Sequence, residues 1–482
     1  MRWRFILNII GILTFFFGLT MIFPLIVGLY YRDSSVIPLL ESMGVTSLAG
    51  LILYLIFRKH KVEVINQREG MAIVAVGWTA VGFFGAIPFY LGDGAFTFTD
   101  AFFESVSGFT TTGASILTDI ESVSKGLLFW RSFIQWLGGM GIIVLSVAIL
   151  PFLGVGGMQL YKAEVPTPVP DKLKPRIRDT AMILWQVYAL ISLLQVVLLM
   201  LGGMSLFDAL CHTFTTMPTG GFSTRNASIA HYDSVYFDCV IIFFMLLAGI
   251  NFSLHYQMLR GKTLVFWQDS ECRFFLGVVV LLIFAVSLDV FKTVYDTIGE
   301  ALRYGAFQVV SIVTTTGYAT ADYEQWPAMS QLILLLCMFI GASAGSTGGG
   351  MKCLRIMLCF KYCYKELFSL VHPRAVSHIK IGGKTVPDDV MRSVLGFMAL
   401  YVGLFAISSV VLAGTGVDFT TSFGAVAASI GNIGPGFGMV GPVENYAGIP
   451  TLGKWLLAWC MLLGRLEIFT VIILVVPEFW RK

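Results

Sequence analysis

The segment "SGFTTTGAS", residues 107–115, sets three consecutive threonines and a glycine between a short apolar run and a long one. The chain around it has 482 residues, of which 56% are hydrophobic and only 13% are charged. Soluble domains carry about 25% charged residues, so the composition predicts a polytopic membrane protein rather than a large soluble enzyme. Irregular backbone at membrane depth must be buried in protein or line a water-filled path.

Ten segments are apolar enough to cross a bilayer, which takes about 20 residues. Nine are uncharged, the tenth is interrupted only by Arg465 and Glu467, and snorkelling side chains complete the shorter ones. The segments are residues 5–31, 42–57, 71–92, 132–161, 181–207, 239–254, 274–288, 325–351, 393–417 and 455–477. The first is too long for a signal peptide, so we expect a retained helix. The glycines and proline of residues 431–438 argue against an eleventh span over 419–443.

Basic residues indicate the orientation of these spans. The loops predicted on one side carry 24 of the 32 Lys and Arg residues, the opposite loops carry seven, and Arg465 lies inside a span. Cytoplasmic loops are the ones enriched in Lys and Arg. Both termini are therefore predicted to be cytoplasmic, which agrees with an even number of crossings.

A repeat of about 100 residues organises the chain. "TTTG" occurs at Thr110–Gly113 and again, 204 residues later, at Thr314–Gly317. Midway between them lies "MPTG" (Met217–Gly220), and one unit after the second lies "GNIG" (Gly431–Gly434). Each loop follows a full span and a short apolar segment, and another span comes after it. The repeated unit is therefore span, half-helix, loop, span.

Three of the predicted half-helices open near an acidic residue, which can satisfy the free N–H groups of a helix start. These residues are Asp100, Asp208 and Asp418, and Glu300 is a looser match in the third unit. The predicted fold is an all-α polytopic membrane protein with four such pseudo-repeats around one pore and two extra N-terminal transmembrane helices. The predicted regions are 1–67 for the two extra helices, then 68–165, 166–262, 263–370 and 371–482 for the four repeats.

Four such loops around one axis suit the passage of a cation. Backbone carbonyls can replace the hydration oxygens of an ion without fixed charge, and glycine permits the unusual φ that this needs. Threonine hydroxyls can add further oxygens. No Asp or Glu lies in any loop, which favours a monovalent cation. The candidate filter residues are Thr110, Thr111, Thr112, Gly113, Met217, Pro218, Thr219, Gly220, Thr314, Thr315, Thr316, Gly317, Gly431, Asn432, Ile433 and Gly434.

These units, the "GASAGSTGGGMK" break at 341–352 and the closing "LGRLEIFTVIIL" resemble the Trk/Ktr/HKT superfamily of potassium transporters. The N-terminal helices, "QWLGGMGIIVLSVAILPFLGVGGMQLY" and "PEFWR" resemble its TrkH/TrkG branch of bacterial potassium-uptake proteins. The resemblance implies a potassium-channel-like pore in the bacterial inner membrane, a homodimer, and a cytosolic TrkA-type ring that binds NAD or ATP. It assigns K⁺ binding to Thr111, Thr112, Thr219, Gly220, Thr315, Thr316, Asn432 and Ile433.

The loops depart from the TVGYG sequence of tetrameric potassium channels. Only the glycine recurs in all four, Pro218 replaces a threonine, and the fourth loop reads "GNIG". We therefore expect fewer ordered carbonyl rings and looser selectivity against sodium. In the plant branch of the superfamily a serine at the first glycine position accompanies sodium transport, so Gly113 favours potassium.

The glycine-rich break is the candidate gate. Residues 341–352 cannot hold a regular helix well, and they lack the Gly-Lys-Ser/Thr ending of a phosphate loop. The resemblance implies an intramembrane loop that blocks the pore below the filter. It also implies that Arg465 is an electrostatic barrier, whereas the alternative is a structural pair with Glu467 or Glu104. The candidate gate residues are Gly341, Gly345, Gly348, Gly349, Gly350, Lys352 and Arg465.

Two other functions are less favoured by the sequence than a potassium-conducting pore. A symporter coupled to H⁺ or Na⁺ would show paired helix breaks and intramembrane acids, and only one span is clearly broken. A membrane enzyme would need clustered His, Asp or Glu, but the six histidines are scattered and no organic cofactor motif is present.

The basic segments 158–180 and 355–392 are either docking surfaces for the regulator or topology signals alone. The net charge of +3 gives no reason to expect nucleic acid.

Overall fold

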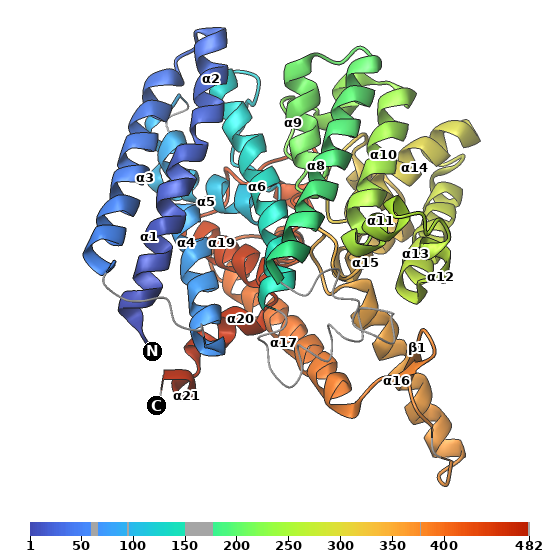
Figure 1. Cartoon of the computed structure of the whole chain (residues 1–482). Coiled ribbons are helices and arrows are strands. Elements are labelled where there is room, and N and C mark those ends of the chain that lie inside the picture. Colours follow the sequence, from blue (N-terminus) through green and yellow to red (C-terminus); the bar gives the residue numbers. More distant parts are fainter. Residues whose placement is uncertain (59–65, 94–95, 150–176, 376, 481–482) are drawn as a thin grey trace.

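The computed structural model describes residues 1–58, 66–93, 96–149, 177–375 and 377–480. The predicted repeat boundary at 165/166 and most of the basic segment 158–180 lie outside these ranges. Figure 1 shows a helical molecule with both termini on one side. The helices and strands are α1 (Trp3–Thr20), α2 (Ile22–Tyr31), α3 (Val36–Phe57), α4 (Gln67–Leu91), α5 (Phe98–Phe109), α6 (Lys125–Ile149), α8 (Ile177–Leu201), α9 (Leu206–Thr216), α10 (Val235–Gly249), α11 (Phe252–Leu259), α12 (Val265–Gln268), α13 (Ser270–Val290), α14 (Ile298–Val313), α15 (Ala328–Ile340), α16 (Cys353–Val371), β1 (Lys380–Ile381), β2 (Lys384–Thr385), α17 (Asp388–Ala413), α18 (Phe419–Ile430), α19 (Thr451–Arg465), α20 (Phe469–Ile472) and α21 (Pro477–Trp480).

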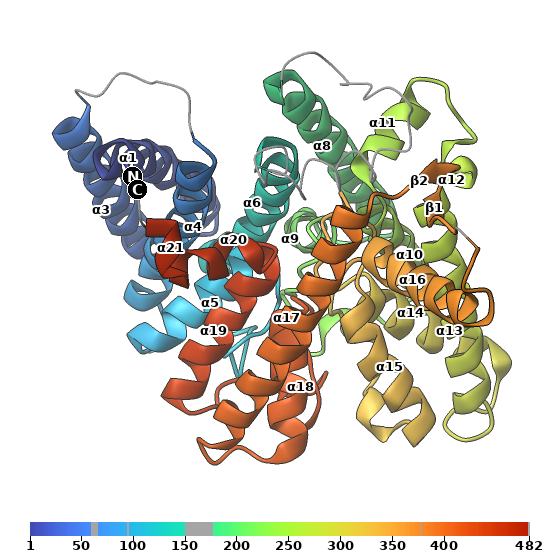
Figure 2. The same cartoon turned by 90° about the horizontal axis from the view of Figure 1, so that it is seen from below.

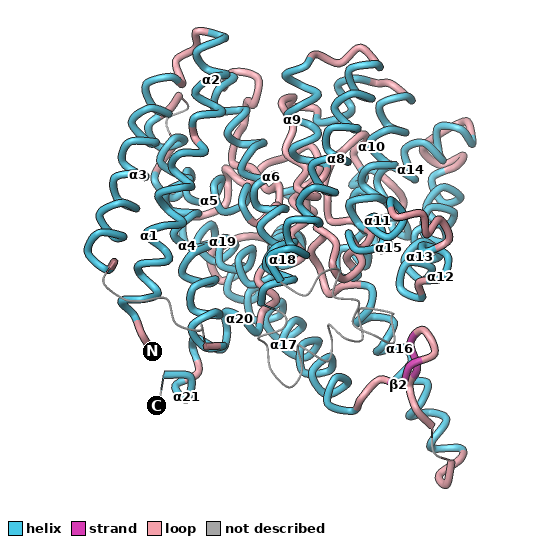
Figure 3. The backbone as a smooth tube through the Cα atoms, in the orientation of Figure 1, coloured by secondary structure: helices cyan, strands magenta, loops and turns pink. Residues whose placement is uncertain are grey.

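The four predicted half-helices are α5, α9, α14 and α18. Each lies between two spans, in the order α4–α5–α6, α8–α9–α10, α13–α14–α15 and α17–α18–α19. Viewed from the side of the termini, the four surround the centre of the molecule (Figure 2). The non-helical backbone gathers at this centre, between the spans (Figure 3). The chain is thus an all-α membrane protein of four pseudo-repeats, with α1–α3 at one flank.

Capping explains why the half-helices start where they do. Thr97, Ser205 and Thr297 are N-caps whose hydroxyls accept from the amides of Asp100, Asp208 and Glu300 at 3.1–3.2 Å, and each hydroxyl also donates to that acid. Glu300 therefore occupies the same position as the first two acids, and describing it as a looser match is wrong. The departure is in the fourth repeat, where Asp418 is itself the N-cap and accepts from the Thr421 amide at 3.0 Å.

Among the described residues, six helices are long and apolar enough to cross a membrane. Eight spans result if each of two sharply bent helix pairs counts as one. The predicted span 132–161 overlaps α6, and its residues 150–161 lie outside the described part. The predicted span 325–351 covers α15 and the non-helical residues that follow it. The sequence places several span starts too late, because charged residues lie inside the helices: α3 begins at Val36 and contains Glu41, and α6 begins at Lys125 and contains Arg131.

Three of the spans that follow a half-helix are broken, not one. α10 meets α11 at 102°, and α19 meets Phe469–Val475 at 112°, while residues 341–352 separate α15 from α16. The expectation of continuous helices over 239–254 and 455–477 is therefore wrong. Asn251 starts α11 by accepting from the Ser253 amide at 2.8 Å. Glu467 and Ile468 adopt φ of 60° and 39°, which ends α19.

The N-terminal flank is held together by close backbone contact. α1 and α2 form one 29-residue span that packs along α3. A Cβ added at Gly50 would lie 2.7 Å from Phe15 Cα and 2.8 Å from the Gly11 carbonyl oxygen. Small residues let membrane helices approach closely where there is no hydrophobic driving force between them. Gly44 on the same helix has no atom within 4 Å of such a Cβ.

Gly50→Leu is expected to lower the stability of the folded protein in detergent by about 1–3 kcal/mol, because it overpacks this contact. The matched control Gly44→Leu should change it by less than about 0.5 kcal/mol. Thermal unfolding followed by size-exclusion fluorescence measures both. Equal loss in the two variants would contradict the packing assigned to α1 and α3.

Candidate functional site

Each half-helix ends in a four-residue loop with one pattern of backbone hydrogen bonds. The loops are loop one (Thr110–Gly113), loop two (Pro218–Gly221), loop three (Thr314–Gly317) and loop four (Gly431–Gly434). The amide at position three of each loop donates to the carbonyl five residues earlier, at 2.8–2.9 Å. These pairs are Thr112 to Ser107, Gly220 to Thr215, Thr316 to Ser311, and Ile433 to Ala428.

The backbone angles follow the same register. Position two has φ of 52° to 59° at Thr111, Thr219, Thr315 and Asn432. Position four has φ of 73° to 100° at Gly113, Gly221, Gly317 and Gly434. A positive φ is uncommon for any residue but glycine and strained for a β-branched one. Such strain persists only where the surroundings impose it, and it gathers at functional sites; here three threonines share it.

The sequence predicts loop two one residue too early. It sets Gly220 against Gly113, whereas the hydrogen bonds and φ angles set Gly221 there, and Met217 is the C-cap of α9. Because Gly220 and Gly221 are adjacent, the sequence does not show which of them aligns with Gly113. The missed signal is the distance to the N-cap, because position four follows Thr97, Ser205 and Asp418 by 16 residues in three repeats. In repeat three the distance from Thr297 is 20, since α14 has one more turn.

The four loops close into a ring. A Cβ added at position four of any loop would overlap the position-three carbonyl oxygen of the next loop. The contacts are Gly113 with Gly220, Gly221 with Thr316, Gly317 with Ile433, and Gly434 with Thr112. The glycine common to all four loops is therefore required by the ring itself, because any side chain would push neighbouring loops apart.

Most threonine hydroxyls brace the loops. Thr110 Oγ1 contacts Thr112 Oγ1 at 2.7 Å and donates to the Val106 carbonyl, and Thr314 does the same with Thr316 and Val310. Loop four joins loop one through Asn432 Nδ2, which donates to Thr112 Oγ1 at 3.0 Å. The expectation that threonine hydroxyls add ion-binding oxygens can therefore apply to Thr111, because its Oγ1 has no hydrogen-bond partner among the described residues.

The backbone carbonyls of the ring differ in whether a protein group donates a hydrogen bond to them. Gly220 O accepts from Gln135 Nε2 at 2.8 Å, and Gly434 O accepts from the Tyr446 hydroxyl at 2.6 Å. Pro218 O accepts from the hydroxyl of the next residue. Position two is the one position at which no carbonyl receives a donor from the part of the chain that the structure describes. Its residues, Thr111, Thr219, Thr315 and Asn432, are all 0% exposed.

The glycine-rich segment 341–352, which the sequence predicts as the gate and which is here called the gate loop, lies against one end of this ring. Gly349 N donates to Thr315 Oγ1 at 2.7 Å, and Thr347 Oγ1 donates to the Met217 carbonyl at 3.0 Å. A Cβ added at Gly348 would lie 3.1 Å from the Thr314 carbonyl oxygen, and one at Gly349 would overlap that of Gly431. The gate loop thus touches loops three and four and the residue preceding loop two.

Left-handed backbone lets the gate loop fold back on itself. Gly341, Gly345 and Gly350 have φ of 70° to 73°, and Lys352 has φ of 71°. Lys352 Nζ donates to the Gly348 carbonyl within the loop. Glu271 at the start of α13 holds it from outside by accepting from the Ala344 amide at 2.6 Å.

Arg465 at the end of α19 reaches the gate loop. It is 3% exposed, and its Nη1 donates to the Thr347 carbonyl at 2.6 Å. Its Nε and Nη2 have no hydrogen-bond partner among the described residues. The two alternative pairings are wrong, because Glu467 pairs with Arg355 at 2.6 Å and Glu104 pairs with Arg131 at 2.6 Å. A buried guanidinium therefore sits beneath the ring with its charge unneutralised by a directly paired carboxylate.

The basic segment 355–392 contains the rest of α16, the β1–β2 hairpin and the start of α17. In Figure 1, α16 and the hairpin project from the body on the side where both termini lie. Lys361 Nζ donates to the Lys380 carbonyl at 2.6 Å, which ties the helix to the hairpin. The segment is continuous with the gate loop, because α16 begins one residue after Lys352.

The sequence and the fold of this chain are similar to those of known proteins. A model of the family described as "TrkH: Cation transport protein" matches residues 40–482. The Trk system potassium uptake protein TrkH of Salmonella typhimurium is 44% identical, with all of both chains covered. The Trk system potassium uptake protein TrkG of Escherichia coli is 38% identical over 99% of each chain. The crystal structure of the potassium transporter TrkH from Vibrio parahaemolyticus superposes with a TM-score of 0.92 at 40% identity, covering both chains in full.

The register of loop two can be tested by comparing its two glycines. Gly221→Ala should destabilise the protein by more than about 1–2 kcal/mol, because a left-handed residue with a Cβ costs that much and the methyl also overlaps Thr316 O. Gly220→Ala meets the movable carboxamide of Gln135 at a negative φ and should lose less. Thermal unfolding in detergent ranks the two. A larger loss for Gly220→Ala would restore the register that the sequence predicts.

Proposed function

The chain belongs to the TrkH family of cation transport proteins, and on that premise we propose that it takes up potassium through the ring of four loops. Its multi-pass helical fold is that of a transporter rather than an enzyme. The proposal assigns K⁺ binding to positions two and three of the loops. These are Thr111 and Thr112, Thr219 and Gly220, Thr315 and Thr316, and Asn432 and Ile433.

The observation that carries the proposal is the set of four undonated carbonyls at position two. A buried carbonyl without a hydrogen bond costs about 1–3 kcal/mol, so four in one ring need a partner. A dehydrating cation supplies that partner, and the carbonyls replace the water oxygens that it gives up. The C-terminal ends of four half-helices converge on the same ring and favour positive charge.

The ring also favours a monovalent ion with moderate selectivity. The four loops contain no carboxylate, so the site lacks the charge that would hold a divalent ion. At positions one, three and four, protein donors occupy one carbonyl each, at Pro218, Gly220 and Gly434. Considering donors from the described residues, position two is then the one ring in which all four carbonyls are free to bind an ion. This supports conduction of K⁺ with weaker exclusion of Na⁺ than several complete rings would give.

We assign the closed state of the pore to the gate loop and Arg465. Gly348 and Gly349 lie directly under the carbonyls of loops three and four, so an ion leaving the ring meets them first. The Arg465 charge repels that ion, and its hydrogen bond to Thr347 keeps the gate loop in place. The gate residues are Gly341, Gly345, Gly348, Gly349, Gly350, Lys352 and Arg465.

The wider assembly is part of the same proposal. It has a homodimer in the bacterial inner membrane, both termini in the cytoplasm, and a TrkA-type ring that binds NAD or ATP. The projection of α16 and the hairpin on the side of the termini supports a cytosolic regulator that acts through the gate loop, since α16 is its direct continuation.

A symporter coupled to H⁺ or Na⁺ is the second candidate. The three broken spans favour it, because discontinuous helices line the sites of many secondary transporters. An alternating-access cycle would make flux depend on the second ion, whereas the carbonyl ring requires only the K⁺ gradient. Flux measurements therefore separate the two candidates.

Liposomes that hold the purified protein should take up K⁺ and Rb⁺ faster than Na⁺ and Li⁺ without a proton gradient. Gly113→Ser should reduce the K⁺/Na⁺ flux ratio, because the added side chain pushes loop one away from the Gly220 carbonyl. Ion-specific flux assays with each gradient in turn measure the ratio. Uptake that needs a proton or sodium gradient, or a ratio unchanged by the variant, would contradict the carbonyl-ring mechanism.

Arg465→Ala should raise the unstimulated K⁺ leak several-fold, because it removes both the charge beneath the ring and the hydrogen bond to Thr347. Arg465→Lys keeps the charge and is expected to leak less than the alanine variant. The same liposomes without any added regulator measure the leak. A leak equal to that of the unmodified protein in both variants would remove Arg465 from the gate.

A further inference from the structure

A buried ion pair lies behind the ring where loops one and two meet. Glu104 on α5 and Arg131 on α6 approach to 2.6 Å, from Nε to Oε1. Their side chains are 0% and 3% exposed. A buried pair of charges is retained only where its geometry and its other hydrogen bonds offset the loss of water, so the remaining contacts of the two side chains indicate what they hold.

Glu104 holds the segment that leaves loop one. Its carboxylate accepts from the Ser115 hydroxyl at 2.9 Å and from the Ile116 amide at 2.9 Å. Ser115 lies two residues after Gly113, whose close approach to Gly220 forms one side of the ring. The carboxylate therefore fixes the outer end of loop one.

Arg131 holds the segment that leaves loop two. Its Nη1 donates to the Ser223 carbonyl at 2.9 Å, and its guanidinium lies 3.6 Å from the centre of the Phe222 ring. One turn further along α6, Gln135 donates to Gly220 O and accepts from the Phe222 amide at 3.3 Å. The arginine thus reaches across the repeat boundary and joins two loops through one guanidinium.

The other junctions of the ring use hydrogen bonds between the segments that leave consecutive loops. Tyr318 after loop three donates to the His212 carbonyl at the end of α9, at 2.9 Å. Tyr323 donates to the Gly436 carbonyl beyond loop four at 2.8 Å, and the Tyr446 amide donates to the Ser115 carbonyl at 2.8 Å. Glu324 after loop three also accepts from the Gly438 amide, so a carboxylate contributes to the junction of loops three and four as well. The junction of loops one and two differs because its contact is a buried ion pair in which each member holds one of the two segments.

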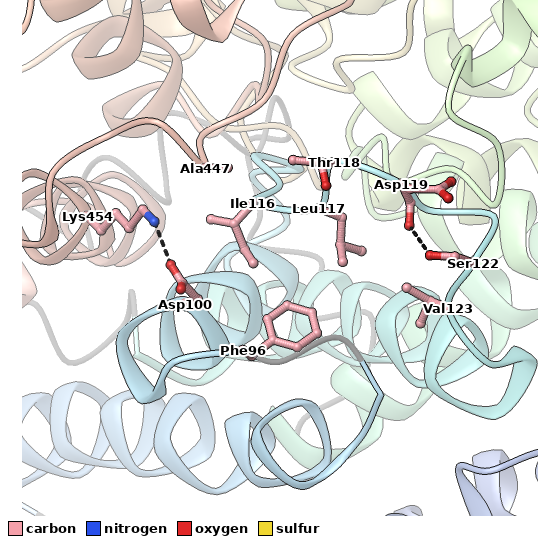
Figure 4. A pocket seen from close by; sticks show the side chains of 10 residues that line it. All are labelled: Phe96, Asp100, Ile116, Leu117, Thr118, Asp119, Ser122, Val123, Ala447 and Lys454. Carbon is pink, nitrogen blue, oxygen red and sulfur yellow. Dashed lines mark hydrogen bonds and ion pairs between the residues drawn. The ribbon is translucent and has the colours of Figure 1, made fainter.

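Packing alone does not fix the segment after loop one. A cavity of about 240 Å³ lies on its outer side, between the start of α5, the start of α6 and the start of α19 (Figure 4). Ile116 and Leu117 line it, and Lys454 and Asp100 form an ion pair at 2.6 Å on its far wall. Because this side is hollow, the segment depends on its polar contacts, which are the Glu104 carboxylate and the Tyr446 amide at Ser115.

We propose that Glu104 and Arg131 are positioning residues that set the spacing of loops one and two and thereby determine which cation the ring accepts. The inference rests on the proposed function, since it concerns the selectivity of that ring. In this proposal neither side chain contacts the ion itself. Without the pair, Ser115–Ile116 and Phe222–Ser223 are no longer joined, and the oxygens of two loops can adjust to a smaller ion.

The experiment measures the K⁺/Na⁺ flux ratio in liposomes for Glu104→Gln and Arg131→Lys. Both should lower the ratio by about tenfold, which corresponds to about 1.4 kcal/mol. Lysine keeps the charge, but it lacks the fork of donors that reaches two acceptors at once. Ser115→Ala removes one donor to the carboxylate and should lower the ratio less, so it serves if the two other variants do not fold.

Asp238→Asn is the matched control, because it neutralises one partner of the 2.6 Å ion pair between Asp238 on α10 and Arg303 on α14, away from the loops. It should lower thermal stability while leaving the flux ratio unchanged. Ratios within twofold of the unmodified protein in Glu104→Gln and Arg131→Lys, or in Ser115→Ala if those variants do not fold, would overturn this inference alone. An equal fall in Asp238→Asn would also overturn it, since general loosening would then explain the effect. An unmodified protein without potassium-selective flux would overturn the proposed function and this inference together.

Discussion

The structure depends on one contact made four times, in which a glycine lies against the carbonyl oxygen of the next loop. Gly113, Gly221, Gly317 and Gly434 bring the loops as close as backbones allow. This proximity buries the position-two carbonyls and leaves them without a hydrogen-bond donor from the described residues. Non-helical backbone survives at membrane depth only when enclosed in this way. The surrounding spans, the capped half-helices and the polar ties behind the loops all serve to keep the ring closed.

The broken spans follow from the same crowding. A span that passes the end of the ring at which the gate loop lies comes within contact distance of the backbone of a half-helix end, as Gly464 does with the Ile430 carbonyl. Three of these spans then turn or open, and their free backbone groups find partners near the ring, such as Thr315 for Gly349 N. Strain at Lys352, Glu467 and Ile468 accompanies these turns. Residues that bend the chain there also place Arg465 under the ring.

The sequence alone is sufficient for the half-helices, the fourfold repeat and the approximate positions of most spans, because apolar length and the recurring glycine are local signals. It failed where the outcome depends on contact between distant segments. The register of loop two was off by one residue, since two adjacent glycines fit equally well until Thr316 O selects Gly221. The residues that separate the two helices of each bent pair, Ile250–Asn251 and Leu466–Ile468, include no glycine or proline. The partners of Glu104 and Glu467 could not be inferred, because both arginines come from other helices.

Each junction of the ring is tied by a different set of side chains, although the backbone contact is the same at all four. In a pore assembled from four identical chains, any substitution appears on every side at once. Here one substitution alters one quarter of the ring and leaves the other three unchanged. Such a ring can therefore be altered one quarter at a time: loop two has a proline and loop four an asparagine at positions where loops one and three have threonine.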